Sequence, residues 1–411
     1  MEHFIGKEIN PNNVKAADIL VGIPSYNEAA TIAYPIKQAA EGLKKYFSDY
    51  KCVIINCDAN STDGTKEIFL NTPTGNIPKI YLSLPPNLTG KGNVLKMLFH
   101  KAGELEAKAI ITVDADLKSI TPKWIRNLGE PLFQDFDYVT PLYVRHKYDG
   151  TITNSVVYPL TRALYGRRIR QPIGGDFGFS ARMAKVYRES NFWDEEVAKF
   201  GIDIWMTTLA INEGVPICQS FMGRPKIHRA KDPAKTLGPM FYQVVGTVFN
   251  LMERFENNWK AVKWSKPTAI FGFGLGETEM PPPVEVDQAS LLQKFLDGFK
   301  QYKPVWEKVI YPPNLNKLEE IKTLSLERFE FPVELWIKII YDFAVGHKNK
   351  VVEQQLICEA LIPLYFGKTL SYVKKTERMS IQEAEEFIDY ECEMFEKAKP
   401  YLLQRWDETT H

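Results

Sequence analysis

Five short apolar segments alternate with helical patterns in the first part of the chain, and this alternation constrains the fold more than any other feature. The segments cover residues 18–23, 52–57, 79–82, 109–113 and 137–143. Each is rich in Ile, Val or Leu, is too short for a helix and runs into polar turn residues. Strands that alternate with helices pair in parallel, because the crossover helices cover both faces of the sheet. We therefore predict an α/β fold with a mostly parallel, Rossmann-like sheet.

The fourth apolar segment ends in Asp114-Ala115-Asp116. In an open α/β sheet, ligands bind at the carboxyl ends of the strands. Two carboxylates one residue apart suit a hard divalent cation, which fills the rest of its shell from phosphate and water. The motif thus favours a metal–diphosphate ligand, although a polar turn without a metal is the simpler interpretation of these residues alone.

Polar residues also follow the other strands. The first runs into Pro-Ser-Tyr-Asn-Glu at 24–28 and then a helix start, where backbone N–H groups can meet an anion or a base edge, or where Ser25 and Asn27 can act as caps. Asp58 ends the second strand and can accept from a uracil or guanine N–H, or fix a turn. Lys91, between two glycines at a helix start, can reach a phosphate, but the spacing is not that of a Walker motif.

The second half offers further candidates. Gly174 and Gly175 precede a strand, which suggests close approach of the backbone to a ligand. The nearby arginines at 167–170 can clamp an anionic acceptor or form a solvated basic edge. Asp203 lies in the first turn of a predicted helix, where a carboxylate is favourable without any further role. His228 follows the predicted strand 217–222.

Length and charge limit the class of protein. The 411 residues suffice for two domains, and a formal net charge of zero argues against nucleic acid as a partner. The five cysteines lack metal-ligand spacing, and the chain has no secretory start, which together favour reduced thiols. We find no apolar run of the ~18 residues that span a bilayer. A soluble, cytoplasmic protein without a transmembrane segment is expected.

The domain organisation is predicted from these patterns. Residues 1–262 are expected to form the catalytic domain, with 1–17 as a loose polar arm. Residues 263–287, rich in Gly and Pro, are expected to form a linker or strap. Residues 288–411 follow a helical pattern and are expected to form a C-terminal domain for packing, for a lid or for a homodimer. The acidic residues between 383 and 396 are assigned to a solvated helix face.

Taken together, the motifs resemble those of nucleotide-sugar glycosyltransferases of the GT-A fold. The first half contributes residues 24–28, 58–64, 90–92 and 114–116. The second half, with residues 144–146, 171–176, 201–203 and 226–229, resembles the mannosylglycerate synthase and glucosyl-3-phosphoglycerate synthase families. The resemblance covers about residues 18–230. It implies metal-dependent transfer of a hexose from a UDP- or GDP-sugar to glycerate or 3-phosphoglycerate, with retention, to make a compatible solute or its precursor.

The resemblance also implies roles for individual residues. The nucleotide sugar would be bound by Pro24, Tyr26, Asn27, Glu28, Asp58 (base), Lys91 (diphosphate), Asp114 and Ala115. The metal, Mg²⁺ or Mn²⁺, would be held by Asp116, with Asp114 and His228. The small anionic acceptor would be bound by Arg145, Thr151, Asn154, Gly174 and Gly175. Asp176 stands where a Glu is familiar, which leaves the phosphorylation state of the acceptor open.

Three residues are candidates for the chemistry itself. Asp116 would hold the cation that neutralises the departing diphosphate. In a retaining reaction that phosphate can take the acceptor's proton, whereas an inverting enzyme would need a carboxylate base, for which Asp176 and Asp203 are candidates.

Three other functions stay open. They are transfer to another small or lipid-linked acceptor, nucleotidyl transfer, and sugar-nucleotide binding without turnover. A nucleotidyltransferase would normally carry a Gly-rich basic loop where this chain has Pro-Ser-Tyr-Asn-Glu.

Overall fold

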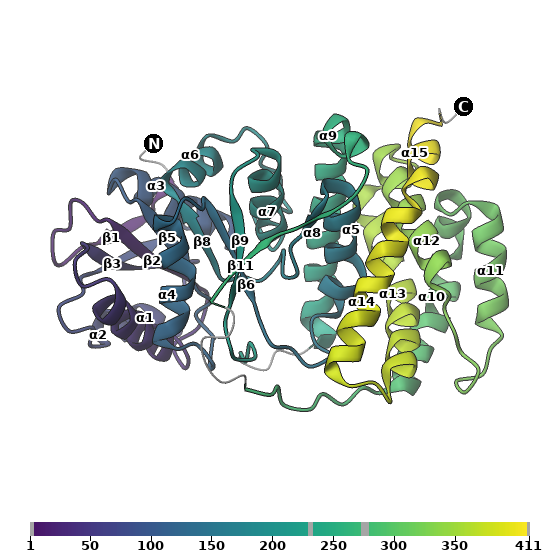
Figure 1. The fold of residues 1–411 in the computed structure, drawn as a ribbon, viewed down its shortest axis with the longest axis horizontal. Coiled ribbons are helices and arrows are strands. Elements are labelled where there is room, and N and C mark those ends of the chain that lie inside the picture. Colours follow the sequence, from purple (N-terminus) through teal and green to yellow (C-terminus); the bar gives the residue numbers. More distant parts are fainter. Residues whose placement is uncertain (1–3, 229–232, 273–278, 409–411) are drawn as a thin grey trace. The chain divides into compact units, whose positions relative to one another are not determined.

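A computed structural model describes residues 4–228, 233–272 and 279–408, with the side chains of 233–236 left aside (Figure 1). The chain divides into two compact units. The sheet unit contains Met1–Arg145, Arg170–Lys231 and Thr268–Pro281, and the helical unit contains His146–Ile169, Asp232–Pro267 and Pro282–His411. Residues 146–169 and 232–262, predicted within the catalytic domain, thus belong to the helical unit. Arg229 of the predicted motif and Gly274 and Gly276 of the predicted strap lie outside the described residues.

A nine-stranded sheet forms the centre of the sheet unit in the described part of the chain, in the order β1-β4-β3-β2-β5-β8-β6-β9-β11. Its strands are β1 (Lys7–Ile9), β2 (Ile19–Ser25), β3 (Cys52–Asp58), β4 (Lys79–Ser83), β5 (Ala109–Thr112), β6 (Tyr138–Leu142), β8 (Phe177–Ser180), β9 (Ile217–Phe221) and β11 (Ala269–Phe271). Neighbours are parallel except that β1 runs antiparallel to β4, and β8 to β5 and β6. The predicted mostly parallel α/β sheet is therefore confirmed.

The prediction of a loose N-terminal arm was wrong, and the predicted linker or strap also contains strands. The expected N-terminal arm contains β1, which is held by its pairing with β4, and Lys101, with a side chain only 1% exposed, also binds Glu8 at 2.8 Å. The expected linker contains β11, which pairs with β9, and β10 (Lys266–Pro267), which pairs with β7 (Arg167–Arg168) in the helical unit. Short strands of two or three residues carry too little periodicity to be recognised in the sequence.

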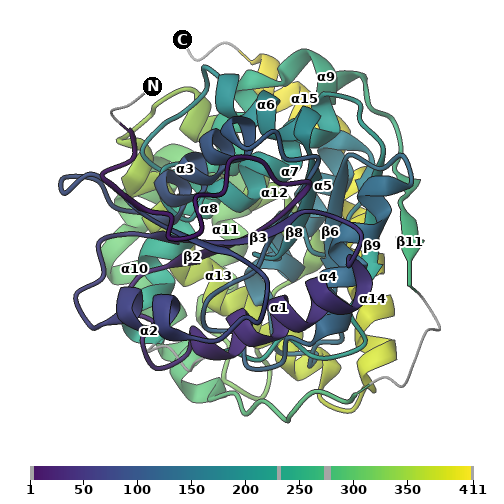
Figure 2. The same ribbon diagram turned by 90° about the vertical axis from the view of Figure 1, so that its left-hand side faces the viewer.

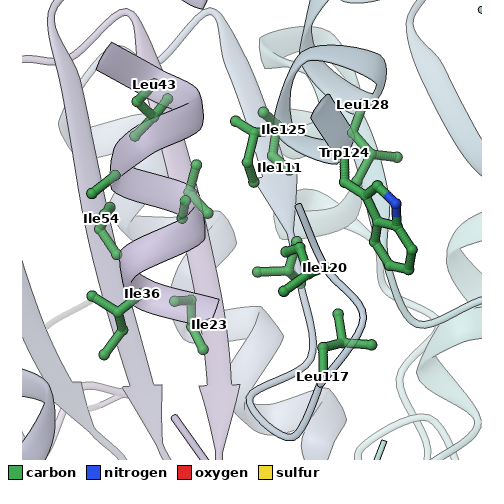
Figure 3. Packing of buried hydrophobic residues seen from close by; sticks show 14 of the residues in the cluster. Ile23, Ile36, Leu43, Ile54, Ile111, Leu117, Ile120, Trp124, Ile125 and Leu128 are labelled. Carbon is green, nitrogen blue, oxygen red and sulfur yellow. The ribbon is translucent and has the colours of Figure 1, made fainter. Parts of the chain in front are cut away.

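Helices cover both faces of the sheet (Figures 1 and 2). One face packs against α1 (Ala33–Tyr46) and α4 (Pro122–Gly129), and the other against α3 (Lys91–Glu104) and α6 (Ala181–Glu189). Ile23 and Ile54 meet Ile36 of α1 on the first face (Figure 3). On the second face Gly22 lets α3 approach, since a Cβ there would lie 2.3 Å from Leu98. Burial on both faces explains why these strands read as continuous apolar runs.

The remaining elements of the sheet unit connect the strands. They are α2 (Thr65–Asn71), the 3₁₀ turn η2 (Glu130–Phe133) and α7 (Ile202–Asn212). The helix α7 begins next to Asp203, as its sequence pattern predicts.

The helical unit packs its helices around buried tryptophans such as Trp306 and Trp336. Its helices are the π-helical turn η3 (Thr153–Val157), α5 (Tyr158–Tyr165), α8 (Pro233–Arg254), α9 (Glu256–Ala261), α10 (Gln288–Val309), α11 (Pro312–Lys322), α12 (Val333–Lys348), α13 (Gln354–Thr376), α14 (Ile381–Lys397) and α15 (Lys399–Asp407). The predicted helical C-terminal region is therefore confirmed.

One described helix, α13, is long and apolar enough to cross a membrane by length and composition, against the expectation from the sequence. Of its most apolar window, 72% is buried inside the protein, as in the core helix of a globular unit. This makes the helix weak evidence for a membrane span. The cytoplasmic location stays a prediction.

The acidic stretch in α14 is not a purely solvated face, which corrects the expectation. Glu391 is 2% exposed and pairs with the equally buried Lys368 of α13. Arg162 of α5, 1% exposed, binds Asp389 at 3.0 Å and also pairs with Glu396. Burial of these charged side chains depends on partners from distant helices. The local acidic pattern in the sequence does not reveal those partners.

Lys399 gives the helical unit an expected dependence on pH. Its ammonium group is buried against the carbonyl oxygens of Trp259 and Val262 at the end of α9, and burial lowers its pKa from 10.5 to about 8. Because the folded state then binds fewer protons than the unfolded state between about pH 8 and 10.5, stability from this group rises with pH across that window. We expect the unfolding free energy of the wild type to gain up to about 3 kcal/mol relative to Lys399→Met between pH 7.5 and 10. Urea denaturation of both proteins across this range measures it, and parallel pH profiles would contradict it.

Candidate active site

The carboxyl ends of three parallel strands bring the predicted site residues to one edge of the sheet. Ser25 ends β2 and is in register with Asp58 at the end of β3. β5 lies on the other side of β2 and leads into Asp114 and Asp116. The parallel pairing thus places three of the sequence motifs side by side, as predicted.

Asp58 is fully buried, and its carboxylate is held by four hydrogen bonds from the protein. Ser25 Oγ and Ser61 Oγ donate to Oδ1 at 2.8 and 2.6 Å, and the Ser61 N–H and the Tyr81 hydroxyl donate to Oδ2 at 2.8 and 3.0 Å. These bonds fasten the turn after β3 to the end of β2. Asp58 therefore shapes the predicted base-binding edge in this structure, and direct contact of its carboxylate with a base stays a prediction.

The loop after β2 is tied to the same turn. Asn27 adopts a positive φ of 54°, donates its backbone N–H to Ser61 Oγ at 2.8 Å and accepts from the Thr62 N–H at 3.0 Å. The Glu28 N–H donates to a threonine hydroxyl of α2 at 2.8 Å. Tyr26, between these anchored residues, is 60% exposed. An exposed aromatic ring on a fixed loop is suited to stack on a nucleobase.

Lys91 lies at the first position of α3 and binds two aspartates from other elements. Its Nζ is 3.2 Å from Asp114 Oδ1 and 3.1 Å from Asp203 Oδ1. Burial works to lower the pKa of Lys91, but the two carboxylates outweigh it and raise that pKa. Burial raises the pKa of Asp203, while Lys91 acts in the opposite direction.

The backbone amides at the start of α3 already donate to carbonyl groups of the protein, since the Gly92 N–H donates to Lys199 O at 3.1 Å. An anion at this edge would therefore meet the lysine side chain.

Asp176, just before β8, is fully buried and fixes the main chain of the Asp114 motif. Its Oδ1 accepts from the Asp114 N–H at 2.9 Å, and its Oδ2 accepts from the Tyr143 hydroxyl and lies 3.1 Å from Lys226 Nζ. Burial raises the pKa of Asp176, and Lys226 opposes that rise. Both carboxylate oxygens are thus engaged in positioning the site.

Lys226 is the central cation of this cluster, and its sequence context alone assigned it no role. Its Nζ lies 2.7 Å from Asp114 Oδ2, 2.7 Å from the Gly174 carbonyl oxygen and 3.1 Å from Asp176 Oδ2. Burial alone would lower its pKa, but Asp114 and Asp176 outweigh burial and raise it. The sequence signal that could have indicated a role for Lys226 was its position two residues before His228, after a strand of the same sheet.

Gly175 is required by this packing. It has a positive φ of 82°, and a Cβ there would lie 2.5 Å from Asp114 Oδ2 and 2.9 Å from Lys226 Nζ. The paired glycines thus allow close approach of the backbone, as their sequence suggested. In this structure the groups that approach are the side chains of Asp114 and Lys226.

The predicted metal ligands lie near one another in the fold without forming a preassembled cage. His228 forms an antiparallel bridge with Leu117, next to Asp116, which is 5% exposed. Within the described ranges, no group of three or more His, Cys, Asp or Glu side chains converges in a way that holds a metal. The predicted ligands nevertheless fit a hard cation in donor type, because Asp114 and Asp116 supply carboxylate oxygens and His228, opposite Leu117, supplies an imidazole.

The predicted acceptor residues fall in both units. In the sheet unit, the Arg145 guanidinium lies over the Tyr143 ring at 5.2 Å from its centre. In the helical unit, Thr151 hydrogen-bonds Tyr365, and Asn154 Nδ2 donates to Asp149 O at 3.0 Å. The role of these residues in binding an acceptor stays a prediction.

Comparison with known proteins agrees with this architecture. Residues 20–194 match the sequence model of the family described as glycosyl transferase family 2. A curated relative, mannosylglycerate synthase from Rhodothermus marinus, is 25% identical over 173 residues, which are 39% of this chain and 42% of the relative. The match thus spans less than half the length of that relative.

Solved structures of glucosyl-3-phosphoglycerate synthase from Mycobacterium tuberculosis are also similar. The complex with Mn²⁺, UDP and glucosyl-3-phosphoglycerate is 22% identical, with a TM-score of 0.46 over 57% of this chain and 80% of that one. The complex with Mg²⁺ and UDP is 23% identical, with a TM-score of 0.46 over 57% and 79%. The predicted resemblance to glycosyltransferases of the GT-A fold is confirmed by the family match, which assigns residues 20–194 to glycosyl transferase family 2.

Proposed function

We propose that the protein transfers a hexose from a UDP- or GDP-sugar to a small anionic acceptor, glycerate or 3-phosphoglycerate. The observation that carries the proposal is the cluster at the carboxyl edge of the sheet, where Lys91 and Lys226 converge on Asp114 within or beside the family 2 region. A half-buried and a buried ammonium group next to a pair of carboxylates after a strand provide what a metal-bound diphosphate needs.

Different residues at this edge of the sheet would bind different parts of the nucleotide-sugar donor. Tyr26 offers a stacking surface for the base, while Asp58 holds the loops that frame it. Lys91 and Lys226 attract the diphosphate and stabilise the negative charge that develops as the sugar leaves. Asp116 and Asp114, with His228, would hold Mg²⁺ or Mn²⁺, which supplies Lewis-acid stabilisation of the leaving diphosphate.

The acceptor is proposed from chemistry and from the curated relative. Arg145 and the glycines at 174–175 lie in the sheet unit, close in sequence or in space to the Asp114 cluster. Mannosylglycerate synthase, as its name states, makes a glycerate derivative. We propose retention of configuration. Under inversion, a base would be needed, and the raised pKa values of Asp176 and Asp203 would favour either carboxylate in that role.

An NMR-monitored transfer assay tests the proposal. The full chain is incubated with Mg²⁺ or Mn²⁺, a panel of UDP- and GDP-sugars, and glycerate or 3-phosphoglycerate. A new α-anomeric signal on one acceptor would identify donor, acceptor and stereochemistry together. Donor hydrolysis without transfer would reject these acceptors and favour another alcohol, whereas binding without any turnover would reject the enzymatic proposal. The homodimer stays a separate prediction.

A further inference from the structure

The ammonium of Lys226 occupies a position built for a cation. Three oxygen atoms from two segments of the chain surround it, one from Asp114 and one each from Gly174 and Asp176, at 2.7 to 3.1 Å. The side chain is only 7% exposed. Carboxylate and carbonyl oxygens are also the ligands that Mg²⁺ and Mn²⁺ take. Asp114 thus offers oxygen atoms that suit either an ammonium group or a divalent cation.

The net charge of the cluster indicates which ligands have to be bound for a cation to be tolerated there. The five groups in contact are two lysines and three aspartates, which sum to −1 when all are ionised. With Asp116, the first of the predicted cation ligands, the sum is −2, so a divalent cation alone would bring the site to zero, but the cation would lie beside two ammonium groups that repel it. The diphosphate of a nucleotide sugar carries about two negative charges and offers these ammonium groups a new partner, so binding both returns the sum to −2.

We propose that Lys226 is an exchangeable counter-ion that couples binding of the divalent cation to binding of the nucleoside diphosphate. In this structure its ammonium satisfies Asp114 and Asp176. When a diphosphate arrives, the ammonium transfers to the phosphate oxygens, and Asp114 becomes available to the cation. Cation and diphosphate therefore bind cooperatively, and each binds weakly alone. The inference rests on the proposed donor site, and it assigns to Lys226 a positioning role that the sequence motif did not indicate.

Lys91 does not play the same part. It bridges Asp114 and Asp203 from the start of α3, on the other oxygen of Asp114. If the Asp114 carboxylate binds a divalent cation, the ammonium of Lys91 still has Asp203 as a partner. Lys226 would keep the Gly174 carbonyl oxygen and Asp176 Oδ2, which also accepts from Tyr143. The exchange is assigned to Lys226 because its Nζ lies nearer to Asp114, at 2.7 Å against 3.2 Å for Lys91.

Binding measurements on the full chain test this without relying on catalysis. Mn²⁺ affinity is measured by electron paramagnetic resonance with and without UDP, and UDP affinity by calorimetry with and without Mn²⁺. In the wild type we expect each ligand to tighten the other by about tenfold or more, equally in both directions. In Lys226→Met, Mn²⁺ alone should bind about fivefold tighter than in the wild type, and the coupling should fall below about threefold. Lys226→Arg should retain the coupling.

The controls separate this inference from the proposed function. Lys37→Met, on the exposed face of α1, should behave as the wild type. Coupling that is unchanged in a folded Lys226→Met protein would overturn the role of Lys226 and leave the transferase proposal standing. Tighter Mn²⁺ binding in Lys226→Met without UDP binding to either protein would support competition for Asp114 and would overturn the proposed donor. Should Lys226→Met fail to fold, loss of coupling in Lys226→Gln provides the same comparison.

Discussion

Replacement of Asp116 by asparagine is expected to lower the rate of sugar transfer by about 10³-fold. Asp116 is buried in the turn that follows β5 and is predicted to hold the cation that neutralises the leaving diphosphate. Lewis-acid stabilisation of that charge is worth several kcal/mol, and each 1.4 kcal/mol changes the rate about tenfold. The amide keeps the shape of the side chain but removes its charge, so the loss should fall on turnover with little change in folding.

Initial rates in the NMR assay, together with Mn²⁺ binding and thermal unfolding, measure this effect. Asp49→Asn, at an exposed position after α1, is the matched control and should retain wild-type rates. Turnover within about tenfold of the wild type in a folded Asp116→Asn protein would reject Asp116 as a metal ligand.

Replacement of Glu391 by alanine is expected to lower the free energy of unfolding by about 3–5 kcal/mol, because it leaves the ammonium of Lys368 buried without its partner. Both side chains are about 2% exposed and pair between α13 and α14. Urea denaturation, with hydrogen exchange to follow α13 and α14 separately, measures the loss. Glu386→Ala on the exposed side of the same helix should change stability by no more than about 0.5 kcal/mol.

The double variant Lys368→Met with Glu391→Leu distinguishes charge burial from packing. Replacing both members of a buried ion pair by apolar residues is often neutral or stabilising. We therefore expect the double variant to recover most of the stability that Glu391→Ala loses. A double variant as unstable as the single one would show that the size or shape of the side chains, rather than the uncompensated charge, causes the loss.

The alternation of apolar strands and helical patterns was sufficient to predict the parallel core of the sheet unit. The apolar strands and the polar residues at their ends are local patterns, and parallel pairing necessarily collects such ends at one edge. The strand-end positions of Ser25, Asp58 and Asp114 therefore follow from the order of the motifs alone, and the register of β2 with β3 and β5 agrees with them. The helical C-terminal region followed for a similar reason, from periodicity within single segments.

The pairing of buried charges could not be predicted and is known only from the folded structure. The cage around Lys226 joins residues from three separate segments, and the pairing of Lys368 with Glu391 joins two helices. No local pattern distinguishes these lysines from solvated ones, because the partner of a buried charge is set by packing between distant elements. The short strands β1 and β11 escaped prediction for a related reason, since they are stabilised by pairing with β4 and β9 and not by periodicity of their own.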